Sequence, residues 1–375
     1  MTSEWNHFAL GEITELVIDY RGKTPKKLGG DWCKQGYRAL SAKNIKTGRI
    51  VQAETIRYID ESLYRKWMKD EVQRGDILIT SEAPFGQIFF WDSDEKIVLS
   101  QRLFCVRIKP EYDARFIYYY MTTPEFQSEL DGRATGTTVI GLRQPELMKC
   151  VIRCPEIQEQ KVIAAILSSI DAKIIANEKV NDNLQQQAQA IYSSMFIDNP
   201  DPAWSHGHLS DLITVKYGKD HKKLADGIYP VYGSGGIMRY VERPLYNKES
   251  VLIPRKGTLN NVMYVNQPFW SVDTMFYTEM KLPNVAKFVY HFVKAKDLAS
   301  MNAGSAVPSM TTDILNAMEA VIPSASALEE FESLVAPMYE AMEANDVQSK
   351  ALSQMRDTLL PKLMSGEIDV SDIQL

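Results

Sequence analysis

The sequence predicts an α+β fold in which two globular domains of mixed α/β structure are each followed by a long α-helix. Three observations support this fold class. The chain has 375 residues, which is more than one compact core usually holds. Two stretches, residues 156–198 and 326–375, carry helical patterns. The second half of the chain also repeats the first, so we expect the two helices to pair as an antiparallel coiled coil with pseudo-two-fold symmetry.

The first globular domain is predicted over residues 1–155, where short segments rich in β-branched and aromatic residues alternate with loops. The strand candidates are Asp76–Thr80, Gln87–Trp91 and Leu103–Ile108, and Ala114–Met121 is predicted as a helix. The loops are rich in Gly, Pro, Lys and Arg, which is typical of a polar surface rather than of a core.

The first long helix is predicted over residues 156–198, a stretch with no Pro or Gly. Its apolar residues recur at alternating steps of four and three, which is the spacing of a heptad seam. The seam consists of Ile163, Leu167, Ile170, Ile174, Leu184, Ala188, Ile191 and Met195, with Asn177 and Asn181 at the two positions in its middle. A helix of this size is about 60 Å long and needs a partner helix to cover the seam.

The second globular domain is predicted over residues 199–325, because the two prolines of Asp198–Trp204 end the helix. This domain echoes the first, as in Leu10-Gly-Glu-Ile and Leu209-Ser-Asp-Leu. From Gly136 onward the match keeps one offset of 168 residues, so Gly136–Val139 corresponds to Gly304–Val307. One long period with two copies indicates a domain duplication.

The second long helix and a C-terminal tail are predicted over residues 326–375, where the offset projects the same seam. The projected pairing residues include Val335, Met342, Asn345, Leu352 and Leu359, and Asn345 corresponds to Asn177. We expect Ser326 and Glu329 to form a capping box, Pro337 to kink or break the helix, and Pro361 to mark its end.

Two long helices could instead fold into separate globular cores. The unbroken heptad and the central asparagines favour a paired rod that holds the globular domains at its opposite ends, since polar seam positions can fix the register of two helices.

Charge is unevenly distributed along the chain, whose net charge is −6. Residues 1–155 contain 23 Lys and Arg against 21 Asp and Glu, and residues 199–325 contain 13 against 11. The helical stretches are acidic, with 3 against 6 in residues 156–198 and 3 against 10 in residues 326–375. The overall acidity therefore does not exclude a nucleic-acid surface on the globular domains.

The expected location is the cytoplasm. No window of about 18 apolar residues is present to span a membrane, and the first residues lack the cationic and apolar segments of a signal peptide. Four cysteines in a chain of 375 residues do not suggest a disulfide framework, so a reducing compartment fits better.

Motifs of catalysis and metal binding are not evident in the sequence. Asn199–Pro202 lacks the aromatic residue and the companion cofactor loop of adenine methyltransferases, and Gly233–Gly236 lacks the ending of a phosphate loop and is predicted as a turn. Cys150 and Cys154 have no second ligand pair, so a zinc site is disfavoured. We expect no catalytic residue, no metal and no cofactor in this chain.

Basic and amide side chains crowd equivalent loops of both domains. Arg and Lys neutralise phosphates, Arg reads guanine, and Asn or Gln reads adenine, although most charged clusters are merely solvated surface. The candidate DNA-binding residues are Arg21, Lys23, Thr24, Lys26, Lys27, Arg38, Lys43, Asn44, Gln87, Thr137 and Thr138 in the first half, and Lys219, His221, Lys222, Lys223, Arg255, Lys256, Asn260 and Asn261 in the second.

Each half resembles a target-recognition domain and its conserved helix in the specificity (S) subunit of type I restriction-modification systems. The resemblance covers nearly the whole chain and is most specific at Arg356–Ile368 (RDTLLPKLMSGEI). The other segments that support the resemblance are Leu10–Ile13, Gly22–Pro25, Gly75–Ile79, Pro84–Gly86, Gln101, Pro155–Lys161 and Leu209–Leu212.

The resemblance implies a non-catalytic subunit whose two domains each read one half of a split, asymmetric double-stranded DNA target. It also implies that the paired helices set the spacer and dock two methyltransferase (modification) subunits, which restriction and translocase subunits join. S-adenosylmethionine, ATP and Mg²⁺ are then expected on those partners. Two other functions remain open: a stand-alone methyltransferase or nuclease, and an S-like scaffold, orphan or decoy without its own DNA specificity.

Overall fold

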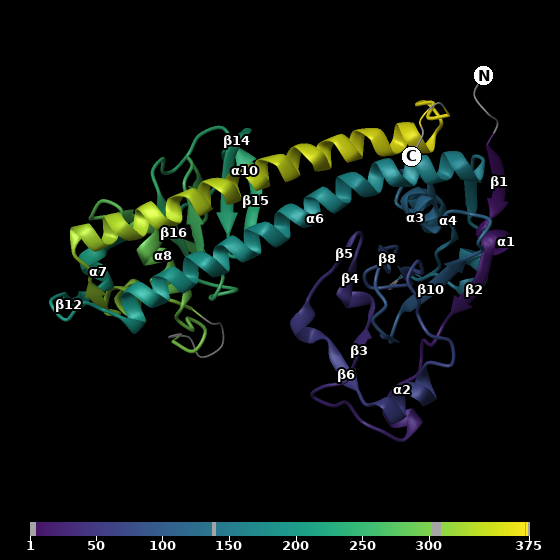
Figure 1. Ribbon diagram of the computed structural model, residues 1–375, viewed down its shortest axis with the longest axis horizontal. Coiled ribbons are helices and arrows are strands. Elements are labelled where there is room, and N and C mark those ends of the chain that lie inside the picture. The colour runs from purple at the N-terminus through teal and green to yellow at the C-terminus, as the bar shows by residue number, and fades with distance from the viewer. Residues whose placement is uncertain (1–4, 137–139, 302–308, 372, 374–375) are drawn as a thin grey trace. The chain divides into compact units, whose positions relative to one another are not determined.

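The computed structural model describes residues 5–136, 140–301, 309–371 and 373. The chain divides into two compact units (Figure 1). Unit 1 comprises residues 1–175 and 348–375, and unit 2 comprises residues 176–347. The two long helices, α6 (Ile157–Ser193) and α10 (Ala325–Met364), therefore each contribute residues to both units.

Unit 1 is built around a four-stranded antiparallel sheet in the order β2-β10-β7-β8, with a smaller sheet in the order β6-β3-β9 and the pairs β1-β11 and β4-β5. Its strands are β1 (Asn6–Ala9), β2 (Thr14–Ile18), β3 (Tyr37–Leu40), β4 (Ile45–Lys46), β5 (Arg49–Ile50), β6 (Arg57–Ile59), β7 (Ile77–Thr80), β8 (Ile88–Phe90), β9 (Val98–Leu99), β10 (Leu103–Ile108) and β11 (Val151–Cys154). Its short helices are α1 (Leu10–Ile13), α2 (Glu61–Trp67), α3 (Ala114–Met121), α4 (Pro124–Arg133) and α5 (Gln144–Leu147).

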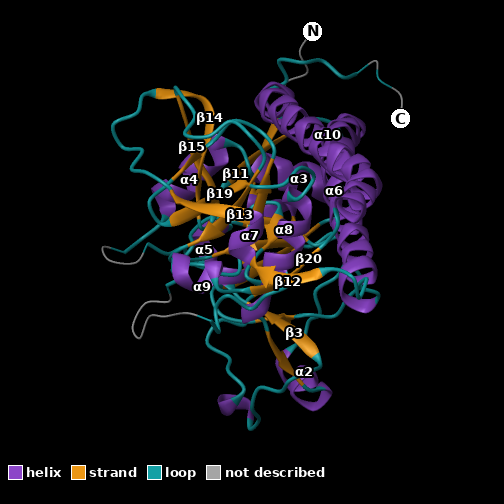
Figure 2. Cartoon of the chain, turned by 90° about the vertical axis from the view of Figure 1, so that its left-hand side faces the viewer, coloured by secondary structure: helices purple, strands orange, loops and turns teal. Residues whose placement is uncertain are grey.

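Unit 2, several of whose strands and helices are labelled in Figure 2, repeats the order of the larger and smaller sheets and of the β1-β11 pair. Among the described residues it has no counterpart of the β4-β5 pair. Its larger sheet has the order β13-β19-β16-β17, its smaller sheet has the order β15-β14-β18, and β12 pairs with β20. The strands are β12 (Ser205–His208), β13 (Ile213–Tyr217), β14 (Asp226–Gly233), β15 (Gly236–Val241), β16 (Ser250–Pro254), β17 (Met263–Val265), β18 (Trp270–Ser271), β19 (Met275–Met280) and β20 (Glu319–Ile322), and the helices are α7 (Leu209–Leu212), α8 (Ala286–Lys294) and α9 (Thr312–Asn316). The predicted duplication of two mixed α/β domains is thus confirmed, and Gly233–Gly236 is the predicted turn between strands.

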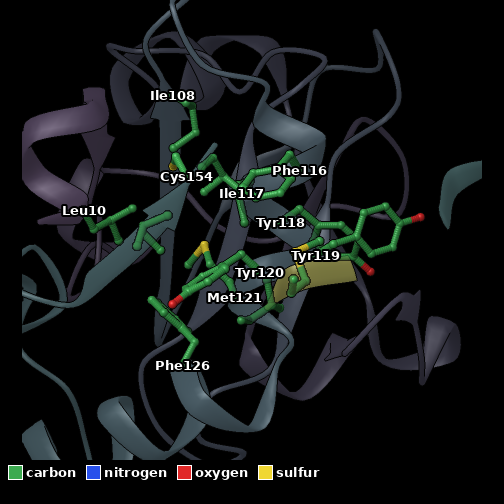
Figure 3. Close-up of a cluster of buried hydrophobic side chains, with 14 of the residues drawn as sticks. Leu10, Ile108, Phe116, Ile117, Tyr118, Tyr119, Tyr120, Met121, Phe126 and Cys154 are labelled. Atoms are coloured by element: carbon green, nitrogen blue, oxygen red, sulfur yellow. The ribbon is translucent and has the colours of Figure 1, made fainter. Parts of the chain in front are cut away.

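The core of unit 1 forms around α3, whose residues Phe116–Met121 are all buried. Figure 3 shows these side chains gathered beside Leu10 and Ile108. The helix begins where the Asp113 carboxylate accepts a hydrogen bond from the Phe116 N–H at 2.8 Å, which satisfies one of its free N–H groups. In unit 2, α8 takes the same place, with Phe288 and Val289 buried.

The seam residues of the two long helices are shielded from solvent, as their heptad spacing predicts. All twelve predicted pairing positions are buried or half-buried. In unit 2 the helices run antiparallel, because the Asn177 amide donates to the Asn345 carbonyl at 3.4 Å and the Asn181 amide donates to the Met342 carbonyl at 3.2 Å. The Asn345 amide also donates to Asn181 Oδ1 at 2.8 Å, so the polar step in the seam is hydrogen-bonded across it.

The two predicted end signals of the second helix were wrong, and the predicted break at Pro337 does not occur. Ser324 caps α10 by accepting a hydrogen bond from the Ala327 N–H at 3.2 Å, whereas Ser326 lies inside the helix. Pro337 does not break α10, which runs without interruption from Ala325 to Met364, and the nearby Val335 is buried in the unit 2 core. Pro361 also lies within α10, which continues to Met364 because that side chain is buried in the unit 1 core.

The first long helix ends as an α-helix at Ser193, and residues Ser194–Asp198 form a π-helical turn before the Asp198–Trp204 boundary. Over the described ranges, no helix combines the length and the apolar character needed to cross a membrane.

Candidate nucleic-acid interface

In each unit, a set of loops lies together at one end of the strands of the larger sheet. In unit 1 the ends of β2 and β7 flank the start of β10, because Ile18 pairs with Cys105 and Thr80 pairs with Leu103. We call residues 19–23, 81–87, 100–102 and 140–142 the unit 1 edge. The corresponding loops, residues 218–224, 255–261, 272–274 and 309–310, form the unit 2 edge.

The same backbone hydrogen bonds hold both edges. In unit 1 the Ser81 N–H donates to the Arg102 carbonyl at 2.9 Å, and the Leu142 N–H donates to the Ser81 carbonyl at 3.0 Å. In unit 2 the Arg255 N–H donates to the Thr274 carbonyl at 2.9 Å, and the Met310 N–H donates to the Arg255 carbonyl at 2.9 Å. Leu142 and Met310 are separated by the 168-residue repeat offset, so the two edges are equivalent surfaces.

Several predicted DNA-binding cations of unit 1 are engaged within the protein. Arg21 pairs with Asp19 at 2.8 Å and lies over the Phe104 ring at 4.1 Å. Lys23 Nζ donates to the Trp67 carbonyl at 2.6 Å, and burial lowers the pKa of this lysine. These side chains hold the loop after β2 in place.

Three other candidates of this first group are also committed to contacts within unit 1. Arg38 forms an ion pair with Glu95. Lys27 Nζ donates to the Gly22 carbonyl at 2.8 Å, and Thr24 Oγ1 accepts from the Lys27 N–H at 3.3 Å.

The two predicted base-reading amides of unit 1 are structural. Asn44 is 1% exposed, and its Oδ1 accepts from the Ser41 N–H while its Nδ2 donates to Thr55 Oγ1 at 3.0 Å. Gln87 Oε1 accepts from the Thr47 N–H at 3.1 Å. Because Asn44 is buried and its amide is hydrogen-bonded within the protein, the prediction that it contacts DNA was wrong. Gln87 instead anchors a hairpin.

Several exposed cations of unit 1 lie on or just before the β4-β5 hairpin. The candidate Lys43 is exposed, and so are Lys46 and Arg49, which were not among the predicted residues. Lys26 is exposed on the loop after β2. None of the ion pairs formed by described residues includes any of these four cations. The candidates Thr137 and Thr138 lie outside the described residues.

The unit 2 edge carries five Lys and Arg against two Asp. Its lysines are exposed, and no described carboxylate pairs with them: Lys219, Lys222, Lys223 and Lys256. Arg255 lies 5.3 Å from the centroid of the Tyr217 ring. This edge presents a locally positive surface suited to phosphates.

The other unit 2 candidates shape the edge. Asn260 Nδ2 donates to Asp297 at 3.0 Å, and Asn261 Nδ2 donates to the Ser234 carbonyl at 2.8 Å. His221 Nδ1 is buried with no hydrogen-bond partner in the described part of the chain. The two asparagines therefore brace the loop after β16, in which Lys256 is exposed.

Cys105, Cys150 and Cys154 are buried thiols, and Cys33 is a half-buried thiol. Burial raises the pKa of Cys150 and of Cys154 to about 12, which keeps both protonated at neutral pH. Outside the masked positions, no group of three or more His, Cys, Asp or Glu is arranged to hold a metal ion.

Comparisons with known proteins agree with this two-domain arrangement. A family model described as a type I restriction modification DNA specificity domain matches residues 2–186 and 203–330. The specificity subunit of the MjaIX type I restriction enzyme of Methanocaldococcus jannaschii is 24% identical over 344 residues, which is 80% of this chain and 79% of the relative. The specificity subunit of the HindI type I restriction enzyme of Haemophilus influenzae is 20% identical, over 80% of this chain and 88% of the relative.

A solved structure also shares the fold. The crystal structure of a type I restriction-modification S subunit from M. genitalium superposes with a TM-score of 0.62, covers 96% of both chains and is 18% identical.

Proposed function

The chain belongs to the type I restriction-modification DNA specificity family, and on this premise we propose that its two edges each bind one half of a split double-stranded DNA target. The observation that carries the proposal is the repeat of one hydrogen-bonded edge in both units, with exposed cations on the edge or beside it. Lysines that lack a carboxylate partner in the protein can neutralise phosphates, and this neutralisation gives DNA binding its affinity and its salt dependence.

The long helices set the spacer between the half-sites in this proposal and dock two modification subunits. Their acidic composition supports a protein-facing role, because residues 326–375 contain 10 Asp and Glu against 3 Lys and Arg. The seam also fixes one register, since its asparagines are hydrogen-bonded across the helix pair. Two weak DNA contacts joined at a fixed distance gain affinity only on targets with the matching spacer.

In this proposal the chain recognises the DNA target, and its partner subunits carry the catalytic activities. The modification subunits would bring S-adenosylmethionine and flip an adenine in each half-site, and restriction and translocase subunits would bring ATP and Mg²⁺. The chain's own residues would bind phosphates and hold the two edges in register.

The test is to co-express the chain with its modification subunit and to map methylated adenines by long-read sequencing. We expect one split motif, methylated once in each half. Combined substitution of Lys222, Lys223 and Lys256 by Ala should abolish this methylation, because DNA affinity falls steeply with each lost phosphate contact. A matched triple variant, Lys109→Ala, Lys149→Ala and Lys281→Ala, should methylate as the wild type does. Lys109 and Lys281 follow the last residues of β10 and β19, at the strand ends opposite the edges, and Lys149 is next to Met148, whose carbonyl accepts from the Gly11 N–H before β2.

An unsplit motif, or no methylation beyond that of the modification subunit alone, would contradict the proposal. Binding to random duplexes without sequence preference would indicate a scaffold or decoy instead.

A further inference from the structure

The two units differ most in one connection of their smaller sheets. In unit 2, β14 and β15 are joined by the two residues Ser234 and Gly235. In unit 1, the equivalent strands β3 and β6 are joined by residues 41–56, which include the β4-β5 hairpin (Figure 1). The strands are equivalent because β14 and β3 each pair in parallel with a third strand, β18 and β9.

Each connection contacts a loop of the edge in its own unit, and the two loops are equivalent: one follows β7 and the other follows β16. In unit 1 the Gly48 N–H at the hairpin turn donates to the Ile88 carbonyl at 3.1 Å, and the Thr47 N–H donates to Gln87 Oε1 at 3.1 Å. In unit 2 the Ser234 carbonyl accepts from Asn261 Nδ2 at 2.8 Å. The most divergent element of each unit therefore lies beside the surface that we assign to DNA.

The unit 1 connection carries an unbalanced pair of cations. Lys46 and Arg49 are directly opposite each other in the antiparallel hairpin, and both are exposed. Like charges in this position destabilise a hairpin. No described carboxylate forms an ion pair with either, and the anchored turn holds the two strands together. An external anion would relieve the repulsion, and the phosphates of a DNA strand supply such anions.

The unit 2 connection carries apolar side chains instead. Ile237 is 43% exposed and Met238 is 61% exposed, at the start of β15. A Cβ placed on Gly233 would lie 2.6 Å from Met238 Sδ, so this glycine leaves room for the methionine to lie over the turn.

Cations flank this apolar turn. Gly257, next to Lys256, lies against Ser234, since a Cβ on Gly257 would be 2.6 Å from Ser234 Oγ. Arg239 donates to the Leu224 carbonyl at 3.0 Å, which brings the loop of Lys222 and Lys223 to the same strand. Apolar groups between phosphate-binding cations suit a DNA groove, where the thymine methyl group is the apolar feature that a protein can read.

We infer that these two connections distinguish the half-sites: the β4-β5 hairpin of unit 1 binds backbone phosphates through Lys46 and Arg49, and the β14-β15 turn of unit 2 contacts thymine methyl groups through Ile237 and Met238. The inference rests on the proposed function. It predicts that thymine is present in one half-site and that its methyl group contributes to binding through unit 2.

The experiment uses the complex of the full chain with its modification subunit, on the split motif that the wild-type complex methylates. Thymines of each half-site are replaced by deoxyuridine, which removes only the methyl group. For the wild type, we expect affinity to fall about fourfold for each contacted methyl, in one half-site only. The double variant Ile237→Ala and Met238→Ala should lose this discrimination, whereas the matched exposed control Ile197→Ala should keep it.

The proposed phosphate contacts of Lys46 and Arg49 are tested by the salt dependence of DNA affinity. Substituting Lys46 and Arg49 by Ala should reduce the slope of log affinity against log salt by about two and leave the uracil effect unchanged. The double variant Lys149→Ala and Lys281→Ala removes an equal charge at exposed positions toward the opposite strand ends, and this control should leave the slope unchanged.

Failure of the inference and failure of the proposed function are distinguishable. A wild-type complex that yields no split motif overturns the proposed function. A split motif whose methyl discrimination survives in the Ile237 and Met238 variant overturns the inference alone. Loss of complex assembly in that variant, with methyl discrimination intact in the fraction that assembles, would instead assign the turn to a protein partner and also overturn it.

Discussion

At the scale of single residues, Tyr119 of α3 and His291 of α8 occupy equivalent places and join each globular domain to the long helices. The Tyr119 hydroxyl donates to Asp171 at 2.7 Å, and Asp171 also accepts from Arg356 at 2.8 Å. In unit 2, His291 Nε2 accepts from the Tyr339 hydroxyl at 2.9 Å. Asp171 and Tyr339 are related by the repeat offset, so the equivalent position takes part in a different hydrogen-bond network in each unit.

The unit 2 network makes stability sensitive to acid. Burial, with a smaller contribution from Lys294, lowers the pKa of His291 to about 4, and its Nδ1 contacts Gln189 Oε1 at 2.8 Å. The neutral tautomer with hydrogen on Nδ1 satisfies both partners. Between pH 6.5 and 4 the unfolded chain binds a proton that the folded chain excludes, so the free energy of unfolding should fall by roughly 3 kcal/mol as pH falls through this window.

Urea unfolding between pH 7.5 and 4 measures this dependence. The variant His291→Gln should be less stable at pH 7.5 but should lose this part of the pH dependence. The exposed control His206→Gln should keep it. Equal pH profiles for the wild type and His291→Gln would show that His291 does not titrate in this window.

At the scale of elements, long periodic segments could be predicted from the sequence and short ones could not. Ala114–Met121 and Leu103–Ile108 are α3 and β10 with their predicted bounds. The two-residue strands β4 and β5 have no periodicity to detect, so Lys46 and Arg49 were missed. Burial of Asn44 depends on Gln52 and Thr55 folding over it, and loop composition does not reveal such a contact.

The intact helix at Pro337 has an energetic consequence. Proline provides no N–H for the Ser333 carbonyl, and a helix-interior proline costs up to about 3 kcal/mol. Because α10 remains helical, Pro337→Ala should restore one hydrogen bond and raise the free energy of unfolding by about 1–3 kcal/mol. Chemical denaturation followed by circular dichroism measures this change.

A matched substitution is available in the same helix. Pro361→Ala lies in the last turn of α10, where fewer backbone hydrogen bonds depend on the helix, so its gain should be smaller. A destabilised Pro337→Ala variant would mean that the proline ring itself packs favourably.

At the scale of the whole molecule, duplication gives one chain two equivalent edges and two helices that contribute to both units. The repeat offset and the seam predicted this plan, because both recur at fixed intervals in the sequence. The identity of the DNA-facing side chains could not be predicted in the same way. In the sequence, Arg21 and Lys23 are loop cations like Lys222 and Lys223. In the structure, however, Arg21 and Lys23 are bound to partners within the protein.

The central claim is that two independent edges read two half-sites at a spacing set by the helices. The most direct measurement inserts one heptad into α6 between Glu178 and Lys179 and one into α10 between Glu343 and Ala344, and then maps the methylated motif. Seven residues add about 10 Å of helix, which is the rise of about three base pairs. The account predicts unchanged half-sites with a longer spacer. An unchanged spacer, or altered half-site sequences, would contradict it.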